Sequence, residues 1–193
     1  TNGADKDAVK ELYRKMSINQ LGGIEKLDFT GIEIPTVEDM EQLGRCLNLC
    51  KNLKTCDLQG VGLIDETCRA LLSTLTDEAH IEELSLAGNK LGLEAARAVA
   101  AYTRVSGSLT CCNVLRNDMD VVAARLLVEA VKDKNISLCG IKSDQTEAVF
   151  SHQGLKPPDA ILLASDLSKA DVSGSLTSLD LRYTELCGVN GDR

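Results

Sequence analysis

The stretch Ile24-Glu-Lys-Leu27-Asp-Phe29 decides the fold, because its pattern recurs along the chain. Apolar residues or cysteine stand at its first, fourth and sixth positions, and equivalent stretches begin at Leu53, Ile81, Leu109 and Leu176. The first four starts are separated by 29, 28 and 28 residues. Successive side chains of a strand point to opposite faces, so the fourth and sixth positions should enter a core while their neighbours face outward. The sequence therefore predicts a repeat protein with one short strand in each repeat.

Each strand is followed by apolar residues at the spacing of an amphipathic helix. The clearest sets are Val37, Met40, Leu43 and Leu47 in the first repeat, and Val121, Ala124, Leu127, Val128 and Val131 in the fourth. One strand and one helix cannot bury their own apolar faces, so the repeats must stack. Because short connections force parallel pairing, we expect six strands in a single parallel sheet in chain order, with helices only on its outer face.

The repeat continues with a polar residue, a further apolar residue and then the helix, and Asn89 and Asn117 take the polar position in the third and fourth repeats. This pattern resembles the leucine-rich repeat of the ribonuclease-inhibitor type, over residues 24 to about 186. The resemblance implies an α/β horseshoe with strands on the concave face and helices on the convex face. It also implies that partner proteins bind to the concave face or the rims. Ile32 and Val61 depart from the pattern, so the turn amides that an asparagine would satisfy need other partners there.

The spacing breaks after the fourth repeat, where two alignments compete for the fifth strand. One uses residues 136–141, and the other uses residues 148–150, followed by Gln153, Leu155 and a helix that starts near Pro158. The second fits the repeat better, so residues 134–144 are interpreted as an insertion. The expected organisation is a capping helix at 4–16 within an N-terminal segment 1–20, then a repeat domain at 21–193 of about six repeats. Its last repeat is incomplete, since no helix is predicted after residue 181.

Composition and cysteine placement limit the partners and the compartment. The 193 residues carry a formal net charge of −8, which disfavours binding to nucleic acid, and no apolar run is long enough to cross a membrane. Cys56 and Cys112 take buried strand positions and are expected to be unpaired, because buried free cysteine packs as a small apolar side chain. We therefore expect an intracellular, reducing compartment, the cytoplasm by default or a chloroplast if a presequence has been removed.

The candidates for chemistry are few, and we expect no enzyme activity, cofactor or metal. His80 and His152 fall in turns of different repeats, and Cys46 and Cys50 share a helix face without further zinc ligands. Cys111 should face outward beside the buried Cys112 and is the best candidate for a modifiable thiol. Asp28 and Asp57 should be neighbours in the sheet, and a solvated pair is favoured over a cation site or an acid–base pair.

The outward columns of the sheet form the candidate protein-binding surface. They are predicted to run Lys26, Thr55, Glu83, Cys111, Glu147, Ser178; then Asp28, Asp57, Ser85, Asn113, Val149, Asp180; and then Thr30, Gln59, Ala87, Leu115, Ser151, Arg182. These columns are poor in aromatic anchors, so the ends, rims and insertion are alternative surfaces. The residues singled out for partner binding are Lys26, Asp28, Asp57, Gln59, Glu83, Asn113, Leu115, Leu181 and Leu186.

The function predicted from these features is that of a non-catalytic scaffold or accessory subunit in a larger protein assembly, with an organellar complex, including a photosynthetic one, as one version. Two regulators built on similar repeats are the alternatives. The entry into the first helix, residues 32–36, resembles the actin-capping repeat domain of tropomodulins, and the GTPase-activating protein for Ran uses the same repeat subtype. At the C-terminal end, Leu179, Leu181 and Leu186 are expected to be only half covered, either because the native chain continues or because a partner docks there.

Overall fold

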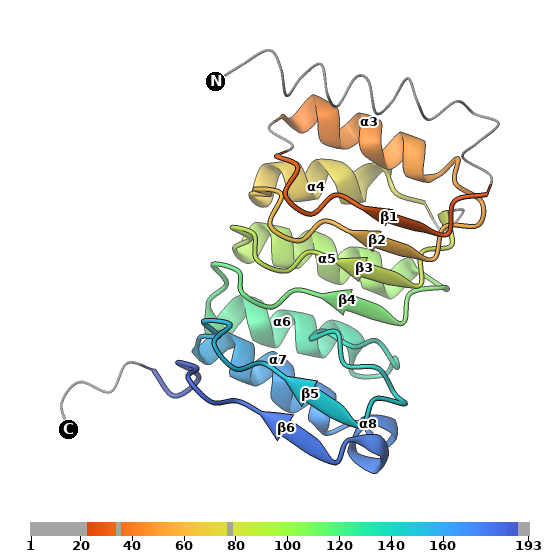
Figure 1. Ribbon diagram of the computed structural model, residues 1–193. Coiled ribbons are helices and arrows are strands. Elements are labelled where there is room, and N and C mark those ends of the chain that lie inside the picture. The colour runs from red at the N-terminus through yellow and green to blue at the C-terminus, as the bar shows by residue number, and fades with distance from the viewer. Residues whose placement is uncertain (1–22, 34–35, 77–78, 189–193) are drawn as a thin grey trace.

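The computed structural model describes residues 23–33, 36–76 and 79–188, in which short strands alternate with helices (Figure 1). The strands are β1 (Lys26–Asp28), β2 (Thr55–Asp57), β3 (Glu83–Ser85), β4 (Cys111–Asn113), β5 (Glu147–Val149) and β6 (Ser178–Asp180). The helices are α3 (Val37–Leu47), α4 (Asp65–Thr74), α5 (Leu93–Val105), α6 (Val121–Val131), α7 (Pro157–Leu167) and α8 (Ala170–Ser175). The expected capping helix at 4–16 lies outside the described residues.

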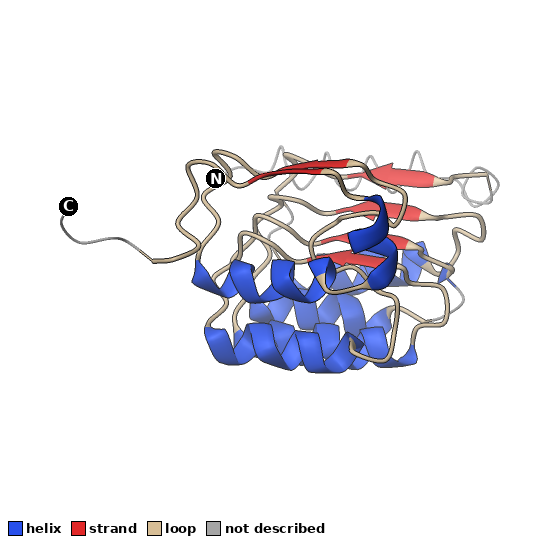
Figure 2. Ribbon diagram, turned by 90° about the horizontal axis from the view of Figure 1, so that it is seen from below, coloured by secondary structure: helices blue, strands red, loops and turns tan. Residues whose placement is uncertain are grey.

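All pairs of neighbouring strands are parallel, as predicted, but the strands form two sheets instead of one. β1, β2, β3 and β4 make the first sheet in chain order, and β5 and β6 make the second. The inward residues of the first sheet are in register at Leu27, Cys56, Leu84 and Cys112. The prediction of a single six-stranded sheet is therefore wrong. Helices lie along one side of the strands (Figure 2), and we call the opposite side of β1–β4 the open face.

The break after β4 is occupied by the segment that was interpreted as an insertion. The Cys112 and Val114 N–H groups donate to the carbonyls of Ser137 and Leu138, at 2.7 and 3.0 Å. Residues 136–138 therefore lie beside β4 in the place of a fifth strand, while residues 147–149 form β5. The structure uses both competing alignments, so residues 134–144 are not a loop set apart from the sheet, as a simple insertion would be.

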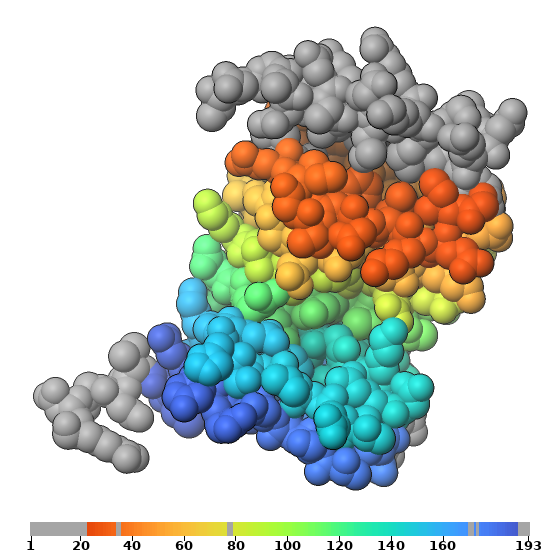
Figure 3. All heavy atoms as spheres, in the orientation of Figure 1, coloured from red at the N-terminus to blue at the C-terminus, as the bar shows by residue number. Residues whose placement is uncertain are grey.

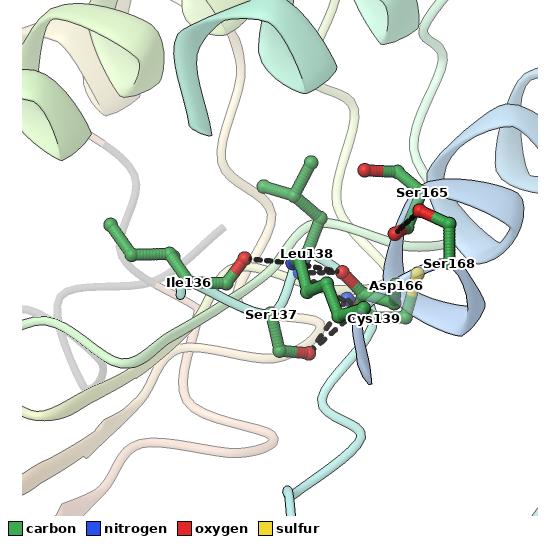
Figure 4. Close-up of polar contacts among 8 residues, drawn as sticks. Ile136, Ser137, Leu138, Cys139, Ser165, Asp166 and Ser168 are labelled. Atoms are coloured by element: carbon green, nitrogen blue, oxygen red, sulfur yellow. Dashed lines mark hydrogen bonds and ion pairs between the residues drawn. The ribbon is translucent and has the colours of Figure 1, made fainter. Parts of the chain in front are cut away.

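The buried carboxylate of Asp166, on α7, ends the first sheet (Figure 4). It accepts hydrogen bonds from the Leu138 N–H and the Cys139 N–H, both at 2.9 Å, and from the Ser137 hydroxyl at 2.7 Å. In a continuing sheet the Leu138 N–H would donate to a carbonyl of the next strand. Lys169 lies 2.7 Å from the same carboxylate and supplies the compensating positive charge.

One position of the repeat has the same unusual backbone in all six strand–turn units. The residue four places after each inward strand residue has a positive φ, between 57° and 78°, at Gly31, Gly60, Gly88, Arg116, His152 and Tyr183. This left-handed conformation costs little for glycine and more for other residues. The shared geometry shows that the β5 and β6 units follow the same local plan as the first four, although they belong to a separate sheet.

Asparagine side chains connect neighbouring repeats inside the core. Asn89 accepts a hydrogen bond from the Leu63 N–H at 3.0 Å and donates to the Leu58 carbonyl at 2.9 Å. Asn117 makes the equivalent contacts one repeat later, accepting from the Leu91 N–H at 3.1 Å. The first repeat has no such side chain, and the Ile32 N–H donates to the Phe29 carbonyl instead. In the first repeat the Phe29 carbonyl therefore has a main-chain donor in place of a side-chain amide.

Candidate functional site

The open face carries the first two of the three predicted outward columns in the predicted register. Lys26, Thr55, Glu83 and Cys111 are neighbours on successive strands, and so are Asp28, Asp57, Ser85 and Asn113. Glu147 aligns with Ser178 and Val149 with Asp180 in the second sheet. Each predicted column is therefore divided between the two sheets.

The column that contains Asp28 and Asp57 stabilises the turns that follow the strands, and this explains why carboxylates recur in it. Side-chain oxygens of Asp28, Asp57, Asn113 and Asp180 each accept a hydrogen bond from the N–H two residues ahead, at 3.0 to 3.1 Å. The hydrogen bond from the Thr30 N–H lowers the pKa of Asp28, and hydrogen bonds from Arg182 lower that of Asp180. Hydrogen bonds that favour the charged form keep such groups ionised. The geometry does not support an acid–base pair of Asp28 and Asp57.

Two hollows indent the open face, with volumes of about 450 and 250 Å³. The smaller is lined by five of the predicted partner-binding residues, Lys26, Asp57, Gln59, Glu83 and Asn113. Glu83, Cys111 and Lys142 line both hollows. The Lys142 ammonium lies 2.6 Å from the Glu83 carboxylate, so this ion pair stands between them. Figure 3 views the molecule from the side of this face.

Lys142 comes from a segment that we call the strap, residues 140–146. At its base Gly140 has a φ of +79°, and a Cβ there would lie 3.0 Å from the Asn113 Nδ2. Ile141 is buried in the core, and the Gln145 N–H donates to the Lys142 carbonyl at 3.2 Å. At its other end the Thr146 carbonyl accepts hydrogen bonds from the Thr177 and Ser178 N–H groups. The strap is therefore fixed at both ends, and Lys142 lies on the turn between them.

The sulfur chemistry of this face is limited by burial. Burial, together with the nearby Glu83 carboxylate, raises the pKa of the half-buried Cys111 thiol to about 11. Little thiolate is present at neutral pH, so Cys111 is a poor nucleophile. Cys56 and Cys112 are buried and unpaired, as predicted.

The second sheet carries exposed apolar and aromatic side chains that the columns of the first sheet lack. Val149 is 60% exposed and Tyr183 is 73% exposed, and Leu179 is partly open to solvent. The Tyr183 ring stacks on His152 with a centroid distance of 4.2 Å and an interplanar angle of 17°. We call Val149, His152, Leu179, Arg182 and Tyr183 the β5–β6 surface.

One predicted site residue, Leu115, lies elsewhere than expected, and two others lie as expected. Leu115 was placed in an outward column, but it is 1% exposed and belongs to the core, as does Ala87. The strand proper ends at Asn113, and the turn that follows rotates the next side chains inward. Leu181 and Leu186 pack against the core near β6 and are partly buried, in agreement with the expected half cover.

Sequence reasoning missed Lys142, Asp166 and the stacked ring pair. Lys142 and Asp166 lie outside the repeat pattern, so no spacing indicated their partners. The ring pair had a usable signal, because His152 and Tyr183 occupy the same repeat position as Gly31, Gly60 and Gly88. Aligning the turns of the repeats would have placed the two rings side by side.

Comparison with protein-family models finds no matching family, and comparison with curated proteins finds no relative. Among the described residues, no three side chains of His, Cys, Asp or Glu come together as a metal site. Within the same residues no helix has the length and apolar character needed to traverse a bilayer.

Proposed function

We propose that this chain is a leucine-rich-repeat horseshoe of the ribonuclease-inhibitor type and acts as a non-catalytic protein-interaction module. It serves as a scaffold or accessory subunit of a larger assembly. The recurrence of strand, left-handed turn and helix supports the repeat assignment. Asn89 and Asn117 support it as well, because they bond turn amides of the preceding repeat. The unpaired core thiols favour a reducing compartment.

The observation that carries the proposal is the exposed β5–β6 surface. Tyrosine and arginine are enriched among the residues that dominate binding energies at protein interfaces. Here Tyr183, Arg182 and Val149 are exposed together at the end of the repeat stack, beside a strand that pairs on one side only within the described chain. Exposed apolar and aromatic side chains that lie together form a surface that a partner can cover.

The test compares two valines of equal exposure. Val149→Asp and Val122→Asp both introduce a carboxylate at a position that is 60% exposed, the first on β5 and the second on α6. Tagged protein is used to recover bound proteins from the native source. A partner retained by wild type and Val122→Asp but lost with Val149→Asp and with Tyr183→Ala supports the proposal. Retention by all four proteins, or loss with Val122→Asp alone, contradicts docking at this surface.

A GTP hydrolysis assay with Ran-type GTPases and an actin-elongation assay separate the scaffold from the two regulators. We expect the purified chain to change neither the rate of GTP hydrolysis nor the rate of actin elongation. An acceleration of hydrolysis or a block of elongation would replace the scaffold with the corresponding regulator.

A further inference from the structure

The strap is attached to the open face by contacts of unequal strength. Residues 136–138 pair with β4, and the Lys134 ammonium donates to the carbonyls of Thr103 and Arg104 at the end of α5, both at 2.7 Å. These contacts and the buried Ile141 fix the chain that leads into the strap. Beyond Ile141, the strap contacts the strands of the open face through the ion pair of Lys142 with Glu83. At its far end the Thr146 carbonyl accepts hydrogen bonds from the Thr177 and Ser178 N–H groups, at 2.8 and 3.1 Å.

This ion pair is partly exposed to solvent. The Lys142 side chain is 59% exposed and the Glu83 side chain 34%. Exposed ion pairs contribute a factor of about two to five to an equilibrium constant, because solvent screens them. A competing charge can therefore displace either partner while the rest of the fold stays intact.

Glu83 lines both hollows, and the side chain that forms an ion pair with it in this structure is a lysine. We propose that the strap is an intramolecular occupant of the open face, in which Lys142 holds Glu83 until a cationic side chain of a protein partner takes its place. The turn that carries Lys142, between the buried Ile141 and the hydrogen-bonded Thr146, then moves off Glu83, and the hollows on either side of the ion pair become one continuous surface. This surface is distinct from the β5–β6 surface, so the chain has a second, gated site.

Charge complementarity identifies the partner as a basic segment. The whole chain has a formal net charge of −8, and the column beside Glu83 contributes the carboxylates of Asp28 and Asp57. Lys26 is the one cationic side chain in the strand columns of the first sheet. A lysine-containing segment therefore gains attraction along the face and also finds the geometry that Lys142 already uses at Glu83.

The experiment measures binding of a fluorescein-labelled decalysine peptide to the full chain by fluorescence anisotropy. Lys142→Met removes the intramolecular competitor. Lys132→Met is the matched control, because it removes the same charge and an ion pair with Glu129 on α6, away from the strap. We expect Lys142→Met to bind decalysine about two to five times more tightly than Lys132→Met. Adding Glu83→Gln to Lys142→Met should abolish the gain.

Hydrogen exchange reports the motion of the strap separately. The Gln145 amide, which donates to the Lys142 carbonyl, should exchange faster in Lys142→Met and in wild type saturated with decalysine. Equal decalysine affinity of the two lysine variants shows that only net charge matters and overturns the proposal. So does a gain that survives Glu83→Gln, or unchanged exchange at Gln145. None of these outcomes depends on Val149 or Tyr183, so failure here leaves docking at the β5–β6 surface to its own test.

Discussion

Single buried polar side chains hold the main chain wherever the stack of repeats needs a hydrogen-bond partner. Asn89 and Asn117 bond the turns of successive repeats, and Asp166 bonds the last segment of the first sheet. Within the described residues, every buried side-chain polar atom has a hydrogen-bond partner. A buried group that loses its partner costs more than the bond itself contributed, so these few positions have a large influence on stability.

We expect Asp166→Ala to lower the free energy of unfolding by about 3–5 kcal/mol. The change leaves the Leu138 N–H, the Cys139 N–H and the Ser137 hydroxyl without their shared acceptor, and it leaves Lys169 without its counter-charge. Urea unfolding followed by circular dichroism measures the loss. Asp118→Ala is the control, because the Asp118 side chain is 62% exposed and its ion pair with Lys156 is long, at 3.6 Å. Equal losses in the two variants would contradict the role assigned to Asp166.

The cysteine thiols should react in an order set by burial. Burial raises the pKa of Cys56 and of Cys68 to about 12, so at pH 8 roughly one thiol in ten thousand is ionised at either site. We expect iodoacetamide to modify the exposed Cys187 first and to leave Cys56, Cys68 and Cys112 unmodified in the native protein. Mass spectrometry of the digested protein measures this order. Early labelling of Cys56 would show that its repeat opens readily.

The same pKa shifts predict how stability changes with pH. The Cys56 thiol is neutral in both states below pH 9, and the folded state keeps its full stability there; above pH 9 the thiol ionises first in the unfolded state, because its folded pKa is raised. Stability is lost as pH rises from about 9 toward 12. The urea midpoint should therefore fall across this range, and it should fall less in Cys56→Ala. An equal fall in the variant would assign the effect to other groups.

At the scale of elements, helix packing depends on close approach as well as on apolar pattern. Gly44 lies in the middle of α3, where glycine is normally unfavourable. A Cβ at this position would lie 1.9 Å from the Thr74 Oγ1 and 3.0 Å from the Leu71 carbonyl oxygen, both on α4. The glycine therefore permits the distance at which α3 and α4 pack.

Gly44→Ala should accordingly destabilise the protein, although the same change in an exposed helix interior stabilises by about 0.5–1 kcal/mol. The reversal of sign has a steric cause, since overpacking of this kind costs about 1–3 kcal/mol. Adding Thr74→Ala removes the nearest atom and should restore part of the loss, as measured by thermal or urea unfolding. A stabilised single variant would mean that α3 shifts freely on α4.

At the scale of the whole molecule, the two sheets are joined through helices and through Asp166 instead of a continuous strand ladder. α6 packs against α7, so the stack of helices continues where the sheet does not. A pair of strands alone is marginally stable, whereas four paired strands with a packed face support one another. The second sheet should therefore open more readily than the first.

Hydrogen exchange of the native protein tests this difference. The Phe150 N–H donates to the Asp180 carbonyl in the second sheet, and the Leu86 N–H donates to the Asn113 carbonyl in the first, both at 2.8 Å. Despite equal bond lengths, we expect Phe150 to exchange by local opening and Leu86 only by global unfolding. Identical protection at the two amides would instead indicate one cooperative unit.

The sequence by itself determined the repeating unit. Alternation at Leu27 and Phe29 and the helical spacing of Met40, Leu43 and Leu47 are local patterns, and short links between parallel strands leave few arrangements for them. The buried, unpaired state of Cys56 and Cys112 followed from the same register. Five of the predicted site residues meet at one hollow for the same reason, because equivalent positions of stacked repeats are neighbours.

Only the tertiary structure decided what happens where the repeat is irregular. Residues 136–138 lie beside β4 while residues 147–149 form β5, and the N–H of Leu138 is bonded by Asp166 from a helix 28 residues later in the chain. The contact between Lys142 and Glu83 likewise joins residues 59 positions apart that share no periodic pattern. The Leu115 side chain points inward because β4 ends at Asn113. The end of the strand depends on hydrogen bonds to the neighbouring strand. Such long-range contacts are fixed by the assembled fold, since local side-chain periodicity carries no information about them.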